Sequence, residues 1–264
     1  MVIVYRLILY LLEKFIFAFL SIYMNKTDWF TDWFNTSYYH TLYKDRNDAD
    51  AQLLIRNITS FLKIPTPSHI LDLPCGKGRH SIYLNSLGYN VTGADLSENS
   101  ILFAKKFEND MLHFEIKDMR KPFAEKYDAI FNLFTSFGYF ENDIDDILVL
   151  KNIKNGLKQN GFIVLDFLNV VHVKNNLVTE EIKTVAGIKF NLQREITDGF
   201  ILKHISFNDK GISHSFTEKV KYLDLEKFET YFSAAGLKIN HIFGNYQLSK
   251  FKSETSDRLI FVAS

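Results

Sequence analysis

The sequence predicts an α/β protein with a mostly parallel, seven-stranded sheet, helices on both faces and a small antiparallel β insert after the fifth strand. Three observations predict this fold. Short apolar strands alternate with helical patterns from Ser68 onward, a glycine turn separates the first strand from its helix, and the rhythm changes near Val171 to short alternating stretches. Alternation of strands and helices implies right-handed crossovers between parallel strands.

The segment before the sheet is helical and aromatic over residues 28–62. Pro65 and Pro67 close it, because proline fits neither a helix interior nor a central strand. Further along, Gly88 is placed to end a helix and Ser97 to cap the start of the next. We expect strands at 69–73, 90–94, 112–116, 129–133 and 162–166, and helices at 80–87, 98–107 and 144–157.

The antiparallel insert is expected from alternating stretches separated by turn residues. Two such separators, 197–199 and 208–211, contain an Asp-Gly and a Lys-Gly pair that suit hairpins. A helix that Gly236 terminates should then lead back into the large sheet. The expected insert strands are 190–196, 200–207 and 213–222, followed by a helix at 225–235 and closing strands at 237–243 and 258–263.

Composition limits the classes of partner and compartment. The 264 residues suffice for one large α/β domain or a domain with an insert. Thirty-one basic residues balance 31 acidic ones, which weighs against a nucleic-acid partner because proteins that bind phosphate backbones usually carry a basic excess. Cys75 is the only cysteine, so no intrachain disulfide forms, and a reducing compartment, the cytoplasm, is expected.

Residues 1–23 form a hydrophobic N-terminal stretch that is long enough to span a bilayer. Glu13 and Lys14 in its middle would cost about 2.5–3.5 kcal/mol each at the bilayer centre. Composition shifts at Met24, so we interpret Met24 as the start of the functional protein and residues 1–23 as an extension that is not native. A membrane anchor and a packed core helix are the alternatives, and a membrane partner is expected only if these residues are translated.

The segment from Ile70 to Ser81 carries the sharpest chemical signal. A buried strand runs into a glycine turn and then into a helix N-terminus, so backbone N–H groups face a ligand that approaches without meeting a Cβ. Gly76 and Gly78 supply this turn, while Ser81 occupies the place of the third glycine of the dinucleotide fingerprint. The absence of the third glycine disfavours a nicotinamide or flavin cofactor.

Two further carboxylates are expected at the same edge of the sheet. Asp95 ends the next strand, where an acidic side chain accepts hydrogen bonds from both hydroxyls of a ribose. Asp118 follows the third strand, where a carboxylate suits an exocyclic amine of adenine. Each alone could be a loop residue or a helix cap. With Asp72 at the end of the first strand, their joint placement predicts one ligand crevice.

At these residues the sequence resembles the class I S-adenosylmethionine-dependent methyltransferases, whose fold is Rossmann-like. ILDLPCGKGRHS is similar to the first motif of that family, VTGADLS to its ribose motif and FEIKDMR to its adenine motif. Residues 128–140 resemble a narrower group, which includes sugar N-methyltransferases and glycine N-methyltransferase-like enzymes and carries an antiparallel insert. The resemblance covers about residues 38–263 and implies S-adenosyl-L-methionine (SAM) as cofactor.

The resemblance also implies roles for particular residues. Asp72, Gly76 and Gly78 would surround the methionine moiety, and Asn132 and Phe134 the methyl-bearing end. Asp95 would hold the ribose, and Asp118 and Met119 the adenine. The expected cofactor-binding set is completed by Tyr39, Pro74, Cys75, Arg79, Leu96 and Ser97, and no metal is expected. Cys75 is interpreted as a packing residue, since methyl transfer needs no thiolate.

The chain would then consist of a helical lid region (24–67), a SAM-binding domain (68–170 and 223–264) and an acceptor-side insert (171–222). Motifs for methylating nucleic-acid bases are absent, which favours a small-molecule acceptor. His40, Tyr139 and Asn169 are the catalytic candidates, and Asp166 is a further residue that could orient an acceptor. A single histidine is more often structural, Tyr139 could be a core aromatic, and Asn169 could simply tie down a turn.

Other charged residues have two interpretations each. Arg79 and His80 at a helix start either hold the lid or face solvent. Arg194, Lys203 and Glu218 on the insert strands either meet solvent or, if that face roofs the site, select a charged or polyhydroxylated acceptor.

Three other functions stay open at this point. They are an NAD(P)-dependent oxidoreductase, a non-catalytic cofactor-binding protein, and a membrane-attached enzyme acting on a lipid or quinone precursor. A homodimer also stays open.

Overall fold

The structure is a computed structural model that describes residues 28–44 and 48–264. The expectations for residues 1–23 and for Met24 lie outside the described residues. Among the helices that these ranges contain, none is long and apolar enough to cross a membrane.

The larger sheet has seven strands in the order β10-β11-β5-β4-β1-β2-β3. The strands β1 to β5 run parallel to one another, while β11 runs antiparallel to both β5 and β10. This confirms the predicted fold class. Its strands are β1 (His69–Asp72), β2 (Asn90–Asp95), β3 (Leu112–Ile116), β4 (Tyr127–Asn132), β5 (Leu157–Leu168), β10 (Ile239–Phe243) and β11 (Arg258–Ala263).

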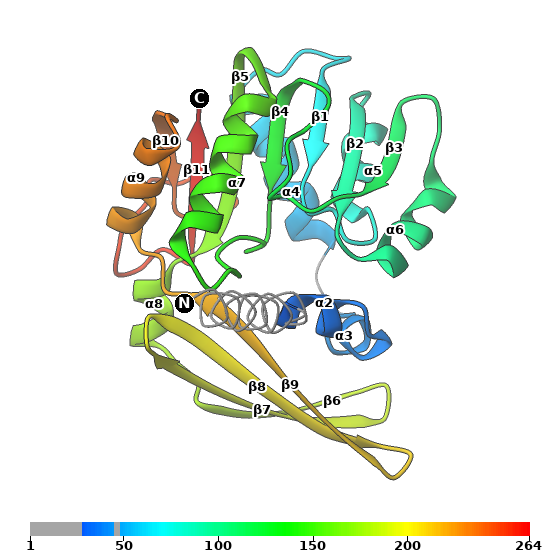
Figure 1. Ribbon diagram of the computed structural model, residues 1–264. Helices are drawn as coiled ribbons and strands as arrows, with labels where there is room; N and C mark the ends of the chain where they lie inside the picture. The colour runs from blue at the N-terminus through cyan, green and yellow to red at the C-terminus, as the bar shows by residue number, and fades with distance from the viewer. Residues whose placement is uncertain (1–27, 45–47) are drawn as a thin grey trace, which may run out of the picture.

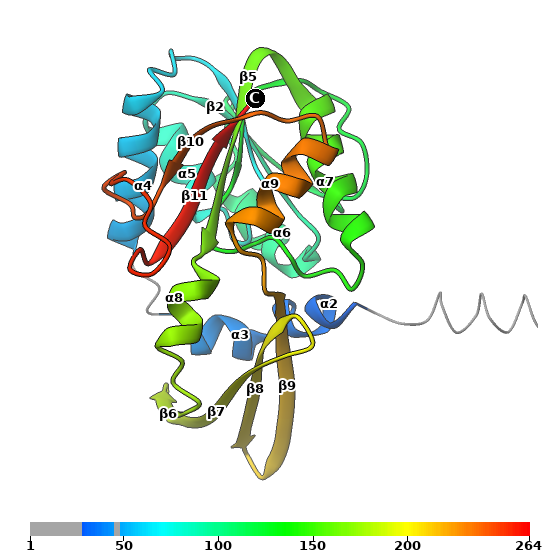
Figure 2. The ribbon, with the colours of Figure 1, turned by 90° about the vertical axis from the view of Figure 1, so that its left-hand side faces the viewer.

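Helices cover both faces of this sheet (Figures 1 and 2). Successive strand residues point to opposite faces, so Ile70 belongs to the core layer under α4, α5 and α6, and Leu71 to the layer under α7 and α9. Gly88 lies just after α5 with positive φ, and Ser97 caps α6 by accepting a hydrogen bond from Ser100 N, as predicted. The helices are α4 (Asp48–Phe61), α5 (Arg79–Ser86), α6 (Glu98–Ala104), the short 3₁₀ helix η1 (Lys105–Phe107), α7 (Asp143–Gly156) and α9 (Leu225–Ala234).

The insert is an antiparallel sheet of four strands in the order β6-β7-β8-β9. Its strands are β6 (Glu180–Val185), β7 (Ile188–Thr197), β8 (Phe200–Asp209) and β9 (Ile212–Lys221). Each connecting turn has two central residues with positive φ, the second being Gly187, Gly199 or Gly211. Positive φ at both positions gives the turn the twist of the flanking strands, so the two predicted hairpins are confirmed.

Helices α2 (Trp29–Phe34) and α3 (Ser37–Leu42) lie between the two sheets (Figure 2). They belong to the expected lid region, and together with Tyr43 and Lys44 they are called the lid below. Trp33 and Leu42 from the lid are buried against Phe190 and Ile205 of the insert. The lid and the insert therefore share a core that is separate from the two layers of the large sheet.

The sequence analysis missed two elements. β6 is mostly exposed along its length and lacks alternating apolar residues, and α8 (Val170–Asn175) has only six residues. The helical region before the sheet consists of three helices rather than one continuous pattern.

Candidate functional site

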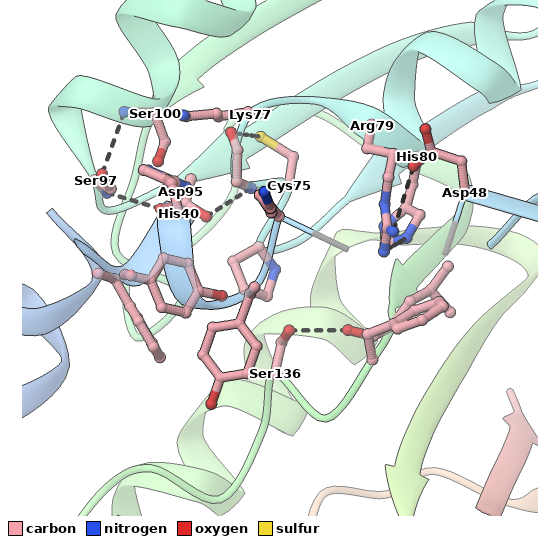
Figure 3. A pocket seen from close by; sticks show the side chains of 18 of the residues that line it. His40, Asp48, Cys75, Lys77, Arg79, His80, Asp95, Ser97, Ser100 and Ser136 are labelled. Carbon is pink, nitrogen blue, oxygen red and sulfur yellow. Dashed lines mark hydrogen bonds and ion pairs between the residues drawn. The ribbon is translucent and has the colours of Figure 1, made fainter. Parts of the chain in front are cut away.

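A cavity of about 370 Å³ lies where β1, β2 and β4 end, beneath the lid (Figure 3). Its floor comes from the turns after the strands, and its roof comes from α3 and the residues that follow it. It is lined by Phe34, Tyr39, His40, Tyr43, Lys44, Asp48, Pro74, Cys75, Gly76, Lys77, Arg79, His80, Asp95, Ser97, Ser100, Leu133, Phe134, Ser136 and Tyr139.

The glycine turn after β1 shapes the floor of the cavity. Gly76 has a φ of 55°, and a Cβ built on it would meet no atom within 4 Å, so its backbone is open to a ligand. Gly78 has a φ of 83°, caps α5 and packs so closely on the Phe114 ring that a Cβ would lie 2.7 Å from it. The first glycine therefore gives access to the backbone, and the second lets the helix approach the sheet.

Asp95 lies at the end of β2, with both carboxylate oxygens held by backbone donors. Gly76 N donates to Oδ2 at 2.8 Å and Ser97 N donates to Oδ1 at 2.8 Å. Burial raises the pKa of Asp95, although these backbone N–H groups oppose the increase. The carboxylate is thereby fixed in one orientation at the cavity wall, where its remaining lone pairs can accept hydroxyl hydrogens.

A second cavity of about 60 Å³ adjoins the first and is largely apolar. Leu96, Met119 and Phe140 line it, which suits a flat aromatic group. Asp118 also lines it, but Arg120 holds both of its oxygens through Nε at 3.0 Å. Burial alone would raise the pKa of Asp118. The hydrogen bonds from Arg120 outweigh this effect, so the pKa of Asp118 lies below its usual value.

Two buried oxygen atoms at neighbouring strand ends are left as acceptors. Asp72 ends β1 and Asn132 ends β4, and both side chains are wholly buried. None of the described residues hydrogen-bonds Asp72 Oδ1 or Asn132 Oδ1, although His80 Nδ1 lies 3.9 Å from Asp72 Oδ1. Neither residue is among those that line the two cavities. Burial raises the pKa of Asp72 to about 7, partly offset by the hydrogen bond from Ser81. Unsatisfied buried acceptors are costly, so these two oxygens are suited to receive hydrogen bonds from a ligand or a bound water molecule.

The wall beyond β4 is made by Phe134, which has a φ of 60°. The His80 ring stacks on Phe134 at 5.0 Å, and the Arg79 guanidinium lies 4.8 Å from the centre of the same ring. Figure 3 shows Arg79 and His80 side by side, with Arg79 Nη2 and His80 Nε2 3.1 Å apart. Asp166 of β5 accepts from Phe134 N at 2.9 Å and so fixes this residue without lining the cavity itself.

The lid brings two of the predicted residues to the cavity. Tyr39 and His40 of α3 both line it, with their ring centres 5.2 Å apart. Tyr139 lines both cavities, and its ring centre lies 5.6 Å from that of Phe34 in α2. His40 and Tyr139 thus face the same space, although they are about 100 positions apart in the chain.

The surroundings of two other predicted residues, Asn169 and Cys75, favour a structural role over a catalytic one. Asn169 caps α8 and donates to the carbonyls of Ser253 and Ser256 at 2.6 and 2.7 Å, which favours the interpretation that it ties down a turn. It does not line the cavity. Cys75 is buried at the cavity wall, and burial raises the pKa of its thiol well above the usual value. Its sulfur is therefore kept protonated.

The sequence analysis missed several cavity residues, among them Phe34, Tyr43 and Ser136. The repeated aromatic residues before the sheet were the available signal, but only the lid geometry determines which of them face the cavity. In the described ranges no group of three or more His, Cys, Asp or Glu side chains is placed to hold a metal ion.

The chemistry of the residues at the strand ends fits the separate parts of S-adenosyl-L-methionine. An α-ammonium group has three donors, which suits the unsatisfied oxygens of Asp72 and Asn132. The open backbone at Gly76 would accommodate the carboxylate end, and the fixed Asp95 carboxylate suits ribose hydroxyls. The apolar second cavity, with Met119 in its wall, suits adenine.

This fold and this site define a class I S-adenosylmethionine-dependent methyltransferase architecture. A sequence profile described as "Tellurite resistance protein TehB" matches residues 22–193, so the chain belongs to the TehB family. The chain is 32% identical over 147 residues to a probable S-adenosyl-L-methionine-dependent methyltransferase TehB of Haemophilus influenzae. That match covers 54% of this chain and only 46% of the relative's length.

Two longer similarities cover most of the chain. An N,N-dimethyltransferase of dTDP-3-amino-3,4,6-trideoxy-alpha-D-glucopyranose from Streptomyces venezuelae is 26% identical over 207 residues, covering 74% of this chain and 84% of that one. A crystal structure of an S-adenosylmethionine-dependent methyltransferase from Clostridium acetobutylicum superimposes with a TM-score of 0.72 at 20% identity. It covers 86% of this chain and 95% of the other, which supports the fold.

Proposed function

We propose that this chain transfers the methyl group of SAM to a nitrogen or oxygen atom of a small molecule, with nitrogen preferred. The observation that carries the proposal is the pair of joined cavities at the strand ends, with the fixed Asp95 carboxylate between them. Asp95 and Tyr139 line both cavities. A volume of about 370 Å³ lies in the range of small-molecule sites. Nitrogen is preferred because one relative is an amino-sugar N,N-dimethyltransferase.

The cofactor would be held by residues from three strand ends. Asp72 and Asn132 would accept hydrogen bonds from the ammonium group, and Asp95 from the ribose hydroxyls. Bound SAM would supply a methyl group on a positively charged sulfur. Gly76 would leave room for the carboxylate end of the cofactor. The apolar wall around Met119 would bind adenine and exclude water.

The main catalytic task of the chain is alignment. Holding two reactants in line contributes about 7–11 kcal/mol towards lowering a barrier of this kind. An amine attacks only when neutral, so a group near the acceptor must take a proton from it. His40 and Tyr139 both line the cavity and are the candidates for contact with the acceptor. Asn169 is left out of this set because its side chain is engaged by the C-terminal segment.

Calorimetric titration of the full chain with S-adenosylhomocysteine (SAH) tests the cofactor, with Asp95→Ala as the site variant. We expect micromolar binding that is lost in Asp95→Ala. Asp128→Ala is a suitable control, since Asp128 lies at the other end of the sheet, where it accepts from His69 N. A folded protein that binds no SAH, or that binds NADH instead, would contradict the proposal.

A screen for SAH release then tests the acceptor. Amino sugars and amino acids make up one panel, and matched hydroxyl compounds make up the other. Turnover with amines supports N-methylation, and turnover confined to hydroxyl compounds would reassign the acceptor atom. Tight SAH binding without turnover on either panel would favour a cofactor-binding protein that is not an enzyme.

A further inference from the structure

The carboxylate of Glu218, on β9 of the insert, joins two lid residues that flank α3. Trp33 Nε1 donates to Glu218 Oε1 at 2.8 Å, and Tyr43 Oη donates to the same carboxylate at 2.7 Å. The helix between these donors has six residues, too few to be stable without tertiary contacts. One side chain of the insert therefore fastens both ends of the segment that roofs the cavity.

Lys203, opposite Glu218 on β8, completes this cluster. Its Nζ donates to Tyr43 Oη at 2.6 Å and lies 3.7 Å from the Glu218 carboxylate. The side chains of Lys203 and Glu218 are only 16% and 17% exposed. Hydrogen bonds to charged groups are stronger than neutral ones, and solvent screens them less when they are partly buried. The cluster is thus a firm attachment rather than a surface ion pair.

The lid has further bonds to the insert. Tyr38 Oη donates to Asp209 at 3.0 Å, and Lys183 Nζ donates to the carbonyl of Leu42 at 3.3 Å. With the Glu218 cluster, these bonds join α3 to β6, β8 and β9. The insert therefore acts as a platform for the lid.

The attachment reaches the cavity through aromatic contacts. The Tyr39 ring lies 5.8 Å from the Trp33 ring and 5.2 Å from the Tyr43 ring. Tyr39 and Tyr43 line the cavity, whereas Glu218 does not. A change at Glu218 therefore acts on the cavity through Trp33 and Tyr43 rather than by direct contact with a ligand.

From this arrangement we infer that Glu218 is a positioning residue for the cofactor lid. It acts through Trp33 and Tyr43, so the insert sheet controls how tightly the cofactor is held. The inference rests on the proposed function of the cavity. It assigns the Lys203 and Glu218 charges to the lid instead of to solvent or to the acceptor.

The test compares Glu218→Ala with Tyr43→Phe, which removes only the hydroxyl. Glu195→Gln is the control, because Glu195 lies on the same sheet, where its Oε1 is 3.2 Å from His204 Nε2, and takes no part in the lid attachment. Hydrogen exchange of the amides of residues 37–43 reports on the lid, and calorimetric titration reports SAH affinity. We expect faster exchange in this segment and a roughly tenfold higher Kd in Glu218→Ala, equivalent to about 1.4 kcal/mol.

A double variant separates positioning from general destabilisation. If the hydroxyl of Tyr43 and the carboxylate of Glu218 act together, the double variant weakens SAH binding by less than the product of the single effects. Unchanged exchange in Glu218→Ala overturns the inference, and so does faster exchange with unaltered SAH affinity. An unmodified protein that binds no SAH contradicts the proposed function instead, and exchange alone then decides whether Glu218 holds the lid.

Discussion

Asp166 and Arg258 form a buried ion pair in which Arg258 Nε donates to Asp166 Oδ1 at 2.8 Å. The other oxygen of Asp166 accepts from Phe134 N, and Arg258 Nη2 donates to Thr135 Oγ1 at 2.9 Å. Phe134 and Thr135 both have positive φ, a strained conformation for residues with a Cβ. The pair therefore holds the turn that forms one wall of the cavity.

Arg258→Met should destabilise the protein by about 3–5 kcal/mol, because it leaves the Asp166 carboxylate buried without its cationic partner. Urea unfolding measures this change. The double variant Asp166→Asn/Arg258→Met should recover part of the loss, since no charge is then left buried. Equal stability of Arg258→Met and the unmodified protein would show that the pair does not hold the turn.

The affinity for SAH should depend on pH through Asp72. Because burial raises the pKa of Asp72 to about 7, the carboxylate is largely protonated at pH 6 and cannot attract an ammonium group. We expect the Kd for SAH to rise about tenfold per pH unit below 7. Asp72→Asn should weaken binding at pH 8 and remove most of this dependence. A constant Kd in the unmodified protein between pH 5.5 and 8 would refute the role of Asp72.

The raised pKa of Asp72 affects folding stability in the opposite direction to SAH binding as the pH falls. The folded state binds the Asp72 proton more tightly than the unfolded state, where the pKa is about 3.9. This group therefore favours folding at low pH, and its contribution is lost as pH rises from about 4 to 7. Asp72→Asn should accordingly make unfolding less dependent on pH in that window, which urea titrations at several pH values measure.

Local signals in the sequence were sufficient for much of the fold. Gly88 and Gly199 have the positive φ that their turns require, and Ser97 caps its helix, because each effect depends on only a few neighbouring residues. The glycine turn and Asp95 were predictable for the same reason. Their positions follow from where strands end in a parallel sheet.

The lid attachment could not be predicted in this way. Glu218 lies 185 positions from Trp33 and 175 from Tyr43, and no periodic pattern encodes such contacts. Its charge on an alternating strand is equally compatible with solvent exposure. Asp118 illustrates the same limit, because its bidentate partner Arg120 is two residues away and only the geometry reveals the pair.

The two glycines of the turn after β1 should respond differently to alanine. Both have positive φ, which costs about 1–2 kcal/mol for a residue with a Cβ. Gly78→Ala should lose about 1–3 kcal/mol more, because its Cβ would meet the Phe114 ring. Gly76→Ala has space in the protein and should instead weaken SAH binding more than it affects stability. Calorimetric titration and urea unfolding of both variants measure this contrast, and equal profiles would contradict it.

Cys75 should be dispensable for chemistry. Burial raises the pKa of its thiol, so little thiolate exists near neutral pH. We expect Cys75→Ala to retain most SAH binding and turnover, with a modest loss of stability. Alkylation by iodoacetamide should be slow in the folded protein and fast in urea. Rapid alkylation under native conditions together with lost turnover would point to a reactive thiol.

His40 is best tested by separating binding from turnover. If His40 takes the proton of the acceptor, His40→Ala should lower kcat by about 10²–10⁴-fold, while SAH affinity stays close to that of the unmodified protein. His113→Ala is the control, since His113 is exposed on β3 and outside the cavity. Steady-state kinetics with an acceptor from the screen measure the effect. Turnover of His40→Ala near that of the control removes His40 as the base and leaves Tyr139, for which Tyr139→Phe is the corresponding variant.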